Sequence, residues 1–310
     1  MNTPMPTAGA VLLTHLGVIR ARGTDATKFL QSQLTNDVAA MDEAEVRLAG
    51  FCSAKGRLQA TFIVWKGGPD DFRLVCSAGL LPSTLKRLSM FVLRAQCKLS
   101  DATPETPLRG LIGETARHAM GDMKPWTRRD AGNDVMLRLP DAAGVARCIV
   151  TAPLDVPSSP GAPSWPDQPA VSLDHWRWLE VQSGIPMIDP ATVDQFVPQM
   201  LNFELLGGVD FQKGCYPGQE VVARSQYRGT IKRRMSLFDS PAPTAAGDEV
   251  FHSDDPRQPA GMVVNAAPGP SGVWSALVEV KLTALDGGTL HLRSADGPVL
   301  QARALPYALA

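Results

Sequence analysis

The chain has 310 residues, about twice the ~150 residues of a typical domain, so we expect two or three packed units. Hydrophobic residues make up 44% and charged residues 20%, which excludes wholesale disorder and allows a soluble protein to bury a large core. The 30 basic and 31 acidic residues leave a net charge of -1. No global field would therefore draw the protein onto nucleic acid or anionic lipid, and any polyanion site must be local.

The sequence lacks the features of membrane, secreted and disulfide-bonded proteins, which predicts a cytoplasmic protein with no membrane contact. No segment approaches the ~18 uncharged apolar residues of a membrane helix. The N-terminus has no basic region before Arg20, unlike a secretory signal. The five cysteines are odd in number and form no CxxC, which fits a reducing compartment better than a disulfide framework. The five histidines lack zinc-site spacing, so we expect no complete zinc site within the chain.

The first hundred residues alternate predicted strands and helices. A strand is expected over 12–21, followed by a turn and a helix whose N-cap is Asp25. Apolar residues at helical spacing give this helix one buried face. Pro82 suits the first turn of a second helix, which leads into a strand at 96–99. This alternation indicates an α+β domain. The buried positions of the first helix are Ala26, Phe29, Leu30, Leu34 and Val38, and the β-rich runs between the helices, expected to form an antiparallel sheet, are 46–52, 58–66 and 72–77.

The second half of the chain divides into three parts. Six prolines within 151–170 predict an exposed connection, because proline resists both helix and central strand. Ser172 can cap the helix that follows, which should end near Gly184. From about Ile231 onward, short strands alternate with glycine- and proline-containing turns, a pattern typical of a small β-barrel or sandwich.

The most informative segment is Phe211 to Arg234, which contains six basic residues and one acid. Pro217 suits the first turn of a helix, Glu220 its positive end and Gly229 its C-cap, so Cys215 should lie just before a helix N-terminus. The helix dipole and the nearby Lys213 both favour a thiolate.

Cys215 is therefore the one cysteine with an activating environment, as a nucleophile or a soft-metal ligand. The alternative is a small buried hydrophobe, and the basic residues can equally form a solvated helix face or an anion site. The other cysteines lie in apolar strand contexts and are expected in the core: Cys52, Cys76, Cys97 and Cys148.

Four stretches carry a family resemblance. They read TDATKFLQSQLTNDV, FCSAKGRLQA, GIPMID and FVPQMLNFELLGGVDFQKGCYPGQEVVARSQYRGTIKRR. Together they resemble the YgfZ-type folate-binding proteins, which are relatives of the glycine-cleavage T-protein, an aminomethyltransferase. The match covers most of the chain in order, and KGCYPGQE is its most discriminating part. The residues that match this family signature are Lys213, Gly214, Cys215, Tyr216, Gly218, Gln219, Glu220 and Arg224.

The resemblance implies an α+β fold with T-protein-like folate-binding subdomains around a central channel, plus a C-terminal β-barrel. Residues 1–230 would form the folate-binding region, as two subdomains with the connection at 151–170, and residues 231–310 the barrel. Tetrahydrofolate would dock in the channel beside Trp176, whose indole face suits a flat ring, although plain core packing is the alternative. The resemblance further places Gln182, Tyr216, Gln219 and Arg224 among the folate-binding residues and Lys213 beside the key cysteine.

Two departures from the T-protein argue against aminomethyl transfer. The transferase carries acidic residues where this chain has Ser53-Ala54-Lys55-Gly56-Arg57, so a general acid or base is missing there. Before Gly184 the transferase uses a glutamate to hold the pterin, and here Gln182 occupies that position without a carboxylate's charge. We therefore expect an accessory factor rather than an enzyme.

These observations leave three alternative functions to be tested. The leading one is a folate-binding accessory factor for iron-sulfur cluster assembly or repair, which affects tRNA thio-modification indirectly. Because one cysteine cannot hold a cluster, Cys215 would share a transient 2Fe-2S cluster with an iron-sulfur scaffold or carrier protein. The second is a tetrahydrofolate-dependent one-carbon transferase acting on a small molecule or tRNA. The third is an RNA-binding module using Arg224 to Arg234, which would show a steep salt dependence.

Overall fold

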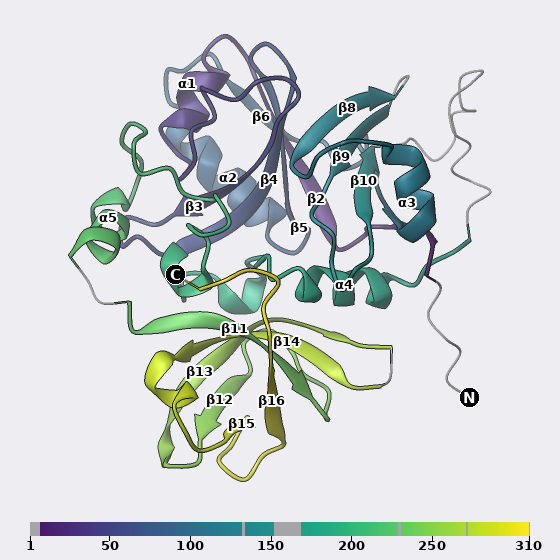
Figure 1. Cartoon of the computed structure of the whole chain (residues 1–310). Coiled ribbons are helices and arrows are strands. Elements are labelled where there is room, and N and C mark those ends of the chain that lie inside the picture. The colour runs from purple at the N-terminus through teal and green to yellow at the C-terminus, as the bar shows by residue number, and fades with distance from the viewer. Residues whose placement is uncertain (1–6, 132–133, 152–168, 229–230, 271, 310) are drawn as a thin grey trace.

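The computed structural model describes residues 7–131, 134–151, 169–228, 231–270 and 272–309. They form two five-stranded antiparallel sheets side by side above a closed six-stranded barrel (Figure 1). No helix among them is long and apolar enough to cross a membrane. Of the Pro-rich connection predicted over 151–170, residues 152–168 fall outside these ranges, as does the C-cap expected at Gly229.

The first sheet has the strand order β3-β4-β5-β2-β6. Its strands are β2 (Leu16–Arg22), β3 (Val46–Cys52), β4 (Leu58–Gly68), β5 (Asp71–Ser77) and β6 (Lys98–Asp101). The three antiparallel runs predicted from 46 to 77 are confirmed. The strand predicted over 12–21 is instead two strands, β1 (Gly9–Leu12) and β2, separated by a turn in which the N–H of Leu16 donates to the carbonyl of Leu13.

Helices α1 (Ala26–Gln31) and α2 (Leu81–Val92) accompany this sheet. Pro82 lies in the first turn of α2, as predicted. The helix whose buried face was expected to run to Val38 ends at Gln31, because the Gln31 side chain accepts the N–H of Val38 at 2.9 Å and turns the chain back. Leu34 and Val38 are nevertheless fully buried, so the apolar pattern was right and the helix length was wrong.

The second sheet has the order β1-β7-β10-β9-β8, and no bounds had been predicted for its last four strands, although Cys148 of β10 was expected in a strand. These strands are β7 (Leu108–Ile112), β8 (Thr127–Ala131), β9 (Asp134–Arg138) and β10 (Arg147–Thr151), with α3 (Gly113–Met120) beside them. Helix α4 (Leu173–Gln182) follows and packs against β1 and against two barrel strands, β13 (Asp255–Pro268) and β14 (Trp274–Lys281). Ser172 caps α4 as predicted, its hydroxyl accepting the N–H of His175 at 3.2 Å.

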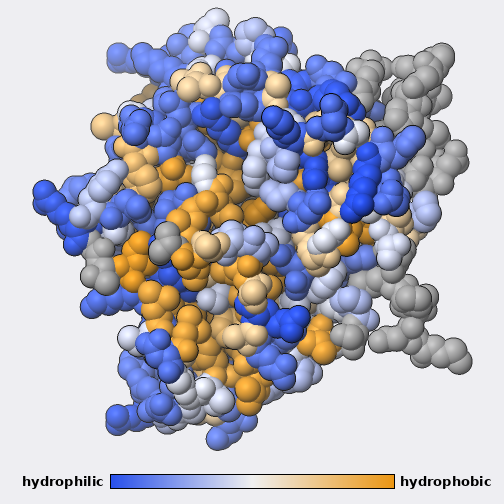
Figure 2. All heavy atoms as spheres, viewed as in Figure 1, coloured by the Kyte–Doolittle hydropathy of each residue, from blue (hydrophilic) through white to orange (hydrophobic). Residues whose placement is uncertain are grey.

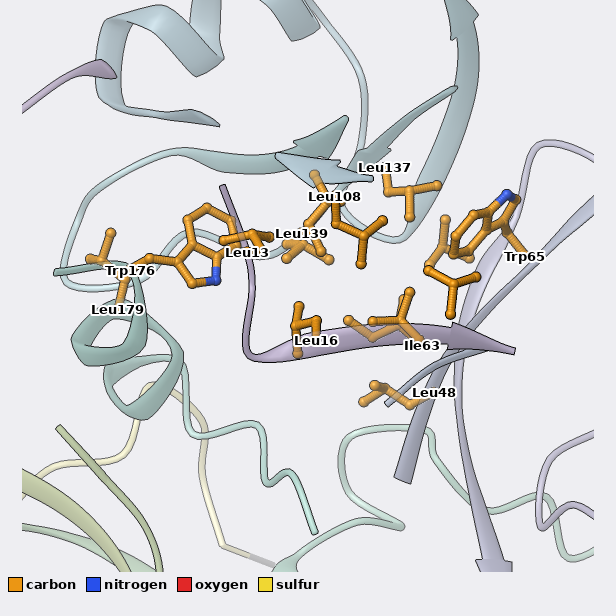
Figure 3. Packing of buried hydrophobic residues seen from close by; sticks show 14 of the residues in the cluster. Leu13, Leu16, Leu48, Ile63, Trp65, Leu108, Leu137, Leu139, Trp176 and Leu179 are labelled. Atoms are coloured by element: carbon orange, nitrogen blue, oxygen red, sulfur yellow. The ribbon is translucent and has the colours of Figure 1, made fainter. Parts of the chain in front are cut away.

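A shared hydrophobic core joins the two sheets and α4 (Figure 3). Leu48, Ile63 and Trp65 reach it from the first sheet, and Leu108 and Leu137 from the second. Each such side chain stabilises the fold by about 1.5–3 kcal/mol when it is removed from water. The two sheets are therefore locked together by their packing.

The barrel closes in the order β11-β14-β13-β12-β15-β16, which leaves no open sheet edge. This confirms the predicted C-terminal barrel. Tyr307, beyond the last strand, donates its hydroxyl to the carbonyl of Gly184 at 2.9 Å and so ties the C-terminal segment to the end of α4. The barrel strands are β11 (Arg233–Ser240), β12 (Glu249–His252), β13 (Asp255–Pro268), β14 (Trp274–Lys281), β15 (Leu290–Leu292) and β16 (Val299–Arg303); the remaining elements are α5 (Gln219–Tyr227) and the 3-10 turns η2 (Pro190–Thr192), η3 (Pro198–Leu201) and η4 (Leu282–Leu285).

Candidate functional site

A cavity of about 550 Å³ lies where the two sheets, α4 and the barrel meet, which matches the expected central channel. Its volume is in the range of small-molecule sites. Every unit contributes to the wall: the lining includes Leu48, Thr61 and Ile63 from the first sheet, Trp126, Leu139 and Arg147 from the second sheet and its connections, Arg177 and Glu180 from α4, and Asn265 and Trp274 from the barrel.

One wall of the cavity carries a cluster of opposite charges. The Glu180 carboxylate lies 2.9 Å from His15 Nε2 and accepts the indole N–H of Trp176 at 2.8 Å. Burial raises the pKa of Glu180, but His15, the Arg147 guanidinium and the Trp176 hydrogen bond outweigh burial and hold it below its usual value. Burial also lowers the pKa of Arg147, to about 10, so at neutral pH the wall presents an ionised carboxylate beside a cation.

The same wall contains an unsatisfied polar atom. His15 Nδ1 is buried and has no hydrogen-bond partner among the described residues. Buried polar atoms are nearly always paired, so this unpaired nitrogen is an exception in a residue that lines the cavity. Glu180 keeps a quarter of its side chain exposed and can accept further hydrogen bonds. The cavity therefore combines the size and the polar groups needed to hold a small molecule.

Trp176 does not line this cavity. Its indole is completely buried in the core, packed so tightly on β7 that a Cβ at Gly110 would lie 2.4 Å from its ring. The structure therefore offers no face of Trp176 for stacking, and core packing describes its place. The tryptophans that line the cavity are Trp126 and Trp274. Trp126 has a φ of 63°, an unfavourable backbone conformation for a bulky residue, and such strain often occurs at functional sites.

Gln182 also faces away from the cavity. Its side-chain amide donates to the Ser275 hydroxyl of the barrel at 2.9 Å. The carboxylate that α4 brings to the cavity is that of Glu180, two residues earlier and therefore on a different side of the helix. Sequence reasoning missed Glu180 because only the fold shows which face of α4 meets the cavity.

Cys215 lies in a different place, a shallow depression that it shares with Thr24, Asp25 and Lys28 of the α1 region. It is exposed, whereas Cys52, Cys76 and Cys148 are buried as predicted, and Cys97 is only partly buried rather than in the core. Among the described residues, none lines both this depression and the central cavity. The structure thus places the thiol apart from the central cavity.

Lys213 anchors the loop that carries Cys215. Its ammonium donates to the backbone carbonyls of Gln31 at 2.5 Å and Leu34 at 2.8 Å, just past the C-terminus of α1, where a cation is favourable. It also lies over the Tyr216 ring, 4.9 Å from the centroid. Burial lowers its pKa to about 8. Lys213 therefore positions the loop, and its hydrogen bonds go to carbonyls rather than to the thiol.

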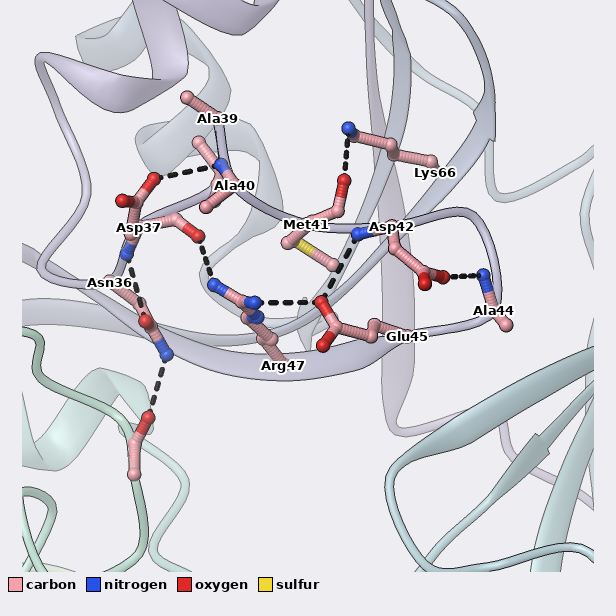
Figure 4. Close-up of polar contacts among 12 residues, drawn as sticks. Asn36, Asp37, Ala39, Ala40, Met41, Asp42, Ala44, Glu45, Arg47 and Lys66 are labelled. Atoms are coloured by element: carbon pink, nitrogen blue, oxygen red, sulfur yellow. Dashed lines mark hydrogen bonds and ion pairs between the residues drawn. The ribbon is translucent and has the colours of Figure 1, made fainter.

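The LTNDV turn, residues 34–38, forms hydrogen bonds with the segment that precedes this loop. The buried hydroxyl of Thr35 donates to the carbonyl of Gly208 and accepts the N–H of Gly50. Asn36 donates to the carbonyl of Gly207 at 2.6 Å, and the Arg47 guanidinium bonds the turn at the carbonyl of Asp37 (Figure 4). The LTNDV stretch thus holds the segment that leads into KGCYPGQE.

The remaining predicted site residues lie around α5. Helix α5 begins at Gln219, so the helix start is four residues beyond Cys215, and Gly218 precedes it with a φ of 80°. Tyr216 is buried, Gln219 is half-buried, and the exposed Arg224 pairs with Glu220 at 2.7 Å. None of these described residues lines the cavity.

Comparison with known proteins identifies the family. A family model described as the GCVT N-terminal domain matches residues 6–136. The chain is 30% identical to the tRNA-modifying protein YgfZ of Sodalis glossinidius, over 99% of this chain and 96% of that protein. It is 29% identical to the same-named protein of Photorhabdus laumondii, over 96% and 92%. The chain belongs to the YgfZ family.

The fold of this YgfZ-family protein is that of the aminomethyltransferases. The crystal structure of glycine cleavage system aminomethyltransferase T from Bartonella henselae superimposes with a TM-score of 0.74, over 98% of this chain and 87% of that one, at 16% sequence identity. At this identity the likeness shows the shared fold.

The region around 53–57 does hold a carboxylate. Asp194, from a distant segment, accepts the Ser53 hydroxyl at 2.9 Å and the Gln59 amide at 2.8 Å. The prediction that 53–57 contains no acid is right for the sequence, but the fold supplies one from outside. Asp194 does not line the cavity among the described residues.

Most bases of the segment 211–234 are already engaged. Arg233 pairs with Glu279, Arg234 with the buried Glu204, and Arg224 with Glu220, while Lys213 is buried. Arg228 and Lys232 are left as exposed cations without an ion pair in the part of the chain that the structure describes. This weakens the basis for an RNA site along the segment.

Proposed function

We propose that the protein is a folate-binding accessory factor for iron-sulfur cluster assembly or repair. The observation that supports this best is the separation of the exposed Cys215 from the central cavity. A transferase that used Cys215 as its nucleophile would need the thiol within reach of the bound folate. An accessory factor can bind folate at one place and offer a thiolate to a partner at another.

The cavity contains groups suited to tetrahydrofolate, which would supply a one-carbon carrier when bound. The ionised Glu180 carboxylate can accept N–H groups of the pterin, and the exposed Arg177 can pair with a carboxylate of the glutamate tail. Trp126 and Trp274 can contact the flat rings. These residues replace Trp176 and Gln182 as the proposed folate contacts.

A cluster would be shared with a partner protein. No group of three or more potential metal ligands occurs among the described residues, and one cysteine cannot hold a cluster alone. An iron-sulfur scaffold or carrier protein would therefore supply the other ligands to a transient 2Fe-2S cluster. The relatives are named tRNA-modifying proteins. Because few bases of 211–234 are free, we propose that the effect on tRNA runs through iron-sulfur enzymes rather than through RNA binding.

Anaerobic mixing with a cluster-loaded scaffold protein tests the cluster role. The wild-type protein should acquire cluster absorption in proportion to its concentration, and Cys215→Ser should not, because serine lacks the soft ligand. Cys97→Ser, which changes another cysteine that is not fully buried, is the matched control and should behave as wild type. Normal cluster sharing by Cys215→Ser would refute the ligand role, and catalytic consumption of tetrahydrofolate would favour the one-carbon transferase instead.

Folate binding has its own test. We expect Trp126→Ala to weaken tetrahydrofolate binding by about 1 to 3 kcal/mol, the scale of one lost stacking partner. Trp178→Phe is the control, because Trp178 is partly buried, bonds Ser275 and does not line the cavity. Isothermal titration calorimetry measures both affinities. Unchanged affinity in a folded Trp126→Ala protein would contradict a stacking role for this residue.

A further inference from the structure

The end of α2 exposes three large apolar side chains next to one another. Met90 is 68% exposed, Phe91 44% and Leu93 89%. Single exposed apolar residues are common on protein surfaces, but adjacent ones are characteristic of interaction sites. Their exposure makes them poor contributors to the core, so stability of the fold does not account for them.

Basic residues flank this apolar group along the chain. Lys86 and Arg87 lie one helical turn before Met90 and Phe91, and Arg94 and Lys98 follow them. All four cations are exposed, and none forms an ion pair within the described part of the chain. The stretch 81–98 contains no acidic residue. We call the seven residues Lys86, Arg87, Met90, Phe91, Leu93, Arg94 and Lys98 the α2 surface.

The α2 surface borders the depression that contains Cys215. Gln96, two residues after Arg94, donates its N–H to the Asp25 carboxylate at 2.7 Å, and Asp25 lines the depression together with Cys215. Asp25 is thereby engaged with the backbone, and the nearby Asp70 accepts the hydroxyl of Thr27 at 2.9 Å. The segment that follows α2 therefore meets the depression that contains Cys215.

We propose that the α2 surface docks an acidic protein and thereby brings that protein to Cys215. The inference rests on the proposed function, in which an iron-sulfur scaffold or carrier must reach this thiol. Four unpaired cations around an apolar centre complement a protein surface that carries carboxylates around apolar side chains. RNA would be recognised by phosphate contacts and by stacking on several aromatic rings, and the α2 surface has only Phe91. A membrane would require a longer apolar face than these three residues.

Photo-crosslinking in cells tests the surface directly. The full chain carries the photoreactive amino acid p-benzoylphenylalanine in place of Met90, and adducts are identified by mass spectrometry. We expect an adduct with an iron-sulfur scaffold or carrier of acidic surface, and we expect Lys86→Glu with Arg87→Glu to abolish it. The same photoreactive group in place of Leu285, a 40% exposed apolar residue of the barrel, should give no such adduct.

Measurements with purified proteins then give the Kd of the complex and decide whether the α2 surface is the docking site. For the captured protein, the double charge reversal should weaken Kd by about tenfold or more, and Met90→Ser with Leu93→Ser should weaken it comparably. Cys215→Ser should abolish cluster sharing even at partner concentrations that saturate the α2 surface. Absence of an adduct, or a Kd indifferent to the charge reversal, overturns the proposal. So does charge-dependent binding of tRNA or of vesicles with 30% phosphatidylglycerol in place of a protein.

The two proposals fail in different ways. A partner that docks on the α2 surface but shares no cluster refutes the proposed function and leaves the docking surface standing. Cluster sharing that survives the charge reversal refutes the docking surface and leaves the role of Cys215 standing.

Discussion

Lys213 is an ammonium group that the protein buries against backbone carbonyls instead of a carboxylate. Carbonyl oxygens carry partial charge only, so they offset part of the cost of removing the cation from water. Asp37 and Asp210 are near enough to favour the charged form, yet burial outweighs them and leaves the pKa at about 8. The loop that presents Cys215 is thus held by a group that titrates well below a free lysine.

This burial predicts a pH dependence of stability. An unfolded chain keeps the ordinary lysine pKa of ~10.4, so between about pH 8 and 10 it binds a proton that the folded protein has released. Stability should then rise with pH over this window. Relative to Lys213→Met, we expect the free energy of unfolding of the wild type to increase by on the order of 1 to 3 kcal/mol between pH 7.5 and pH 10. Urea unfolding of both proteins measures it, and a difference that stays constant would show that the ammonium is not desolvated.

The five cysteines should react in an order set by their surroundings. Burial raises the pKa of Cys52, Cys76 and Cys148 to about 12, so these thiols are both inaccessible and protonated. Cys97 is partly buried with a raised pKa, and Cys215 is exposed. With iodoacetamide under native conditions, we expect modification of Cys215 first, of Cys97 more slowly, and of the others only on unfolding. Mass mapping over time checks this order, and early labelling of a buried thiol would contradict it.

Elements marked by apolar periodicity and turn-forming residues in their own sequence could be predicted. Elements whose ends are fixed by contacts with distant residues could not. The strands from Val46 to Ser77 alternate with clear turn formers and were predicted nearly to their ends. The length of α1 was not, because the Gln31 side chain and Lys213, 182 positions further along the chain, bind the backbone where the helix would continue. Strands β7 to β10 lie in a stretch where no element bounds had been predicted.

Two glycines test how tightly particular elements pack. Gly110 on β7 faces Trp176, and a methyl group there would lie 2.4 Å from the indole ring, whereas a methyl at Gly214 would meet no atom within 4 Å. We expect Gly110→Ala to destabilise the protein by about 1 to 3 kcal/mol and Gly214→Ala to change stability by less than about 0.5 kcal/mol. Thermal unfolding compares the two. A tolerated Gly110→Ala would mean that the core can shift around Trp176, and a costly Gly214→Ala would give this signature glycine a structural role.

At the scale of the whole molecule, the candidate site depends on how the three sheets are placed. Trp176 and Gln182 were chosen from one helix by their residue types, but α4 turns Trp176 into the core and Gln182 toward the barrel, and it leaves Glu180 for the cavity. Cys215 was singled out by its loop and its basic neighbours, which are local features, and the structure finds it exposed. Its position away from the cavity depends on the tertiary fold, so the residues around Cys215 in the sequence could not predict it.

The distribution of hydrophobic residues on the surface also depends on how the sheets and the barrel are arranged. Figure 2 shows hydrophobic residues running from the base of the first sheet across the C-terminal segment onto the barrel, while the α1 and α5 regions are largely hydrophilic. The barrel and the upper sheets thus meet along an apolar seam. Hydrogen bonds also orient the barrel at the cavity. The Asn265 side-chain amide donates to the carbonyl of Met187 at 2.8 Å and accepts its N–H at 2.9 Å.

A ligand in this cavity should therefore act on the three sheets together. Thr61 of β4, Arg147 of β10 and Asn265 of β13 all line it, so bound tetrahydrofolate would stabilise contacts among the two sheets and the barrel. We expect tetrahydrofolate to slow hydrogen exchange in the peptides covering all three segments, and to leave α5 unchanged, because α5 does not line the cavity. Hydrogen exchange with mass spectrometry compares the free and the bound protein. Protection confined to one sheet would place the folate elsewhere than in the central cavity, and protection centred on Cys215 would join the two sites that this structure separates.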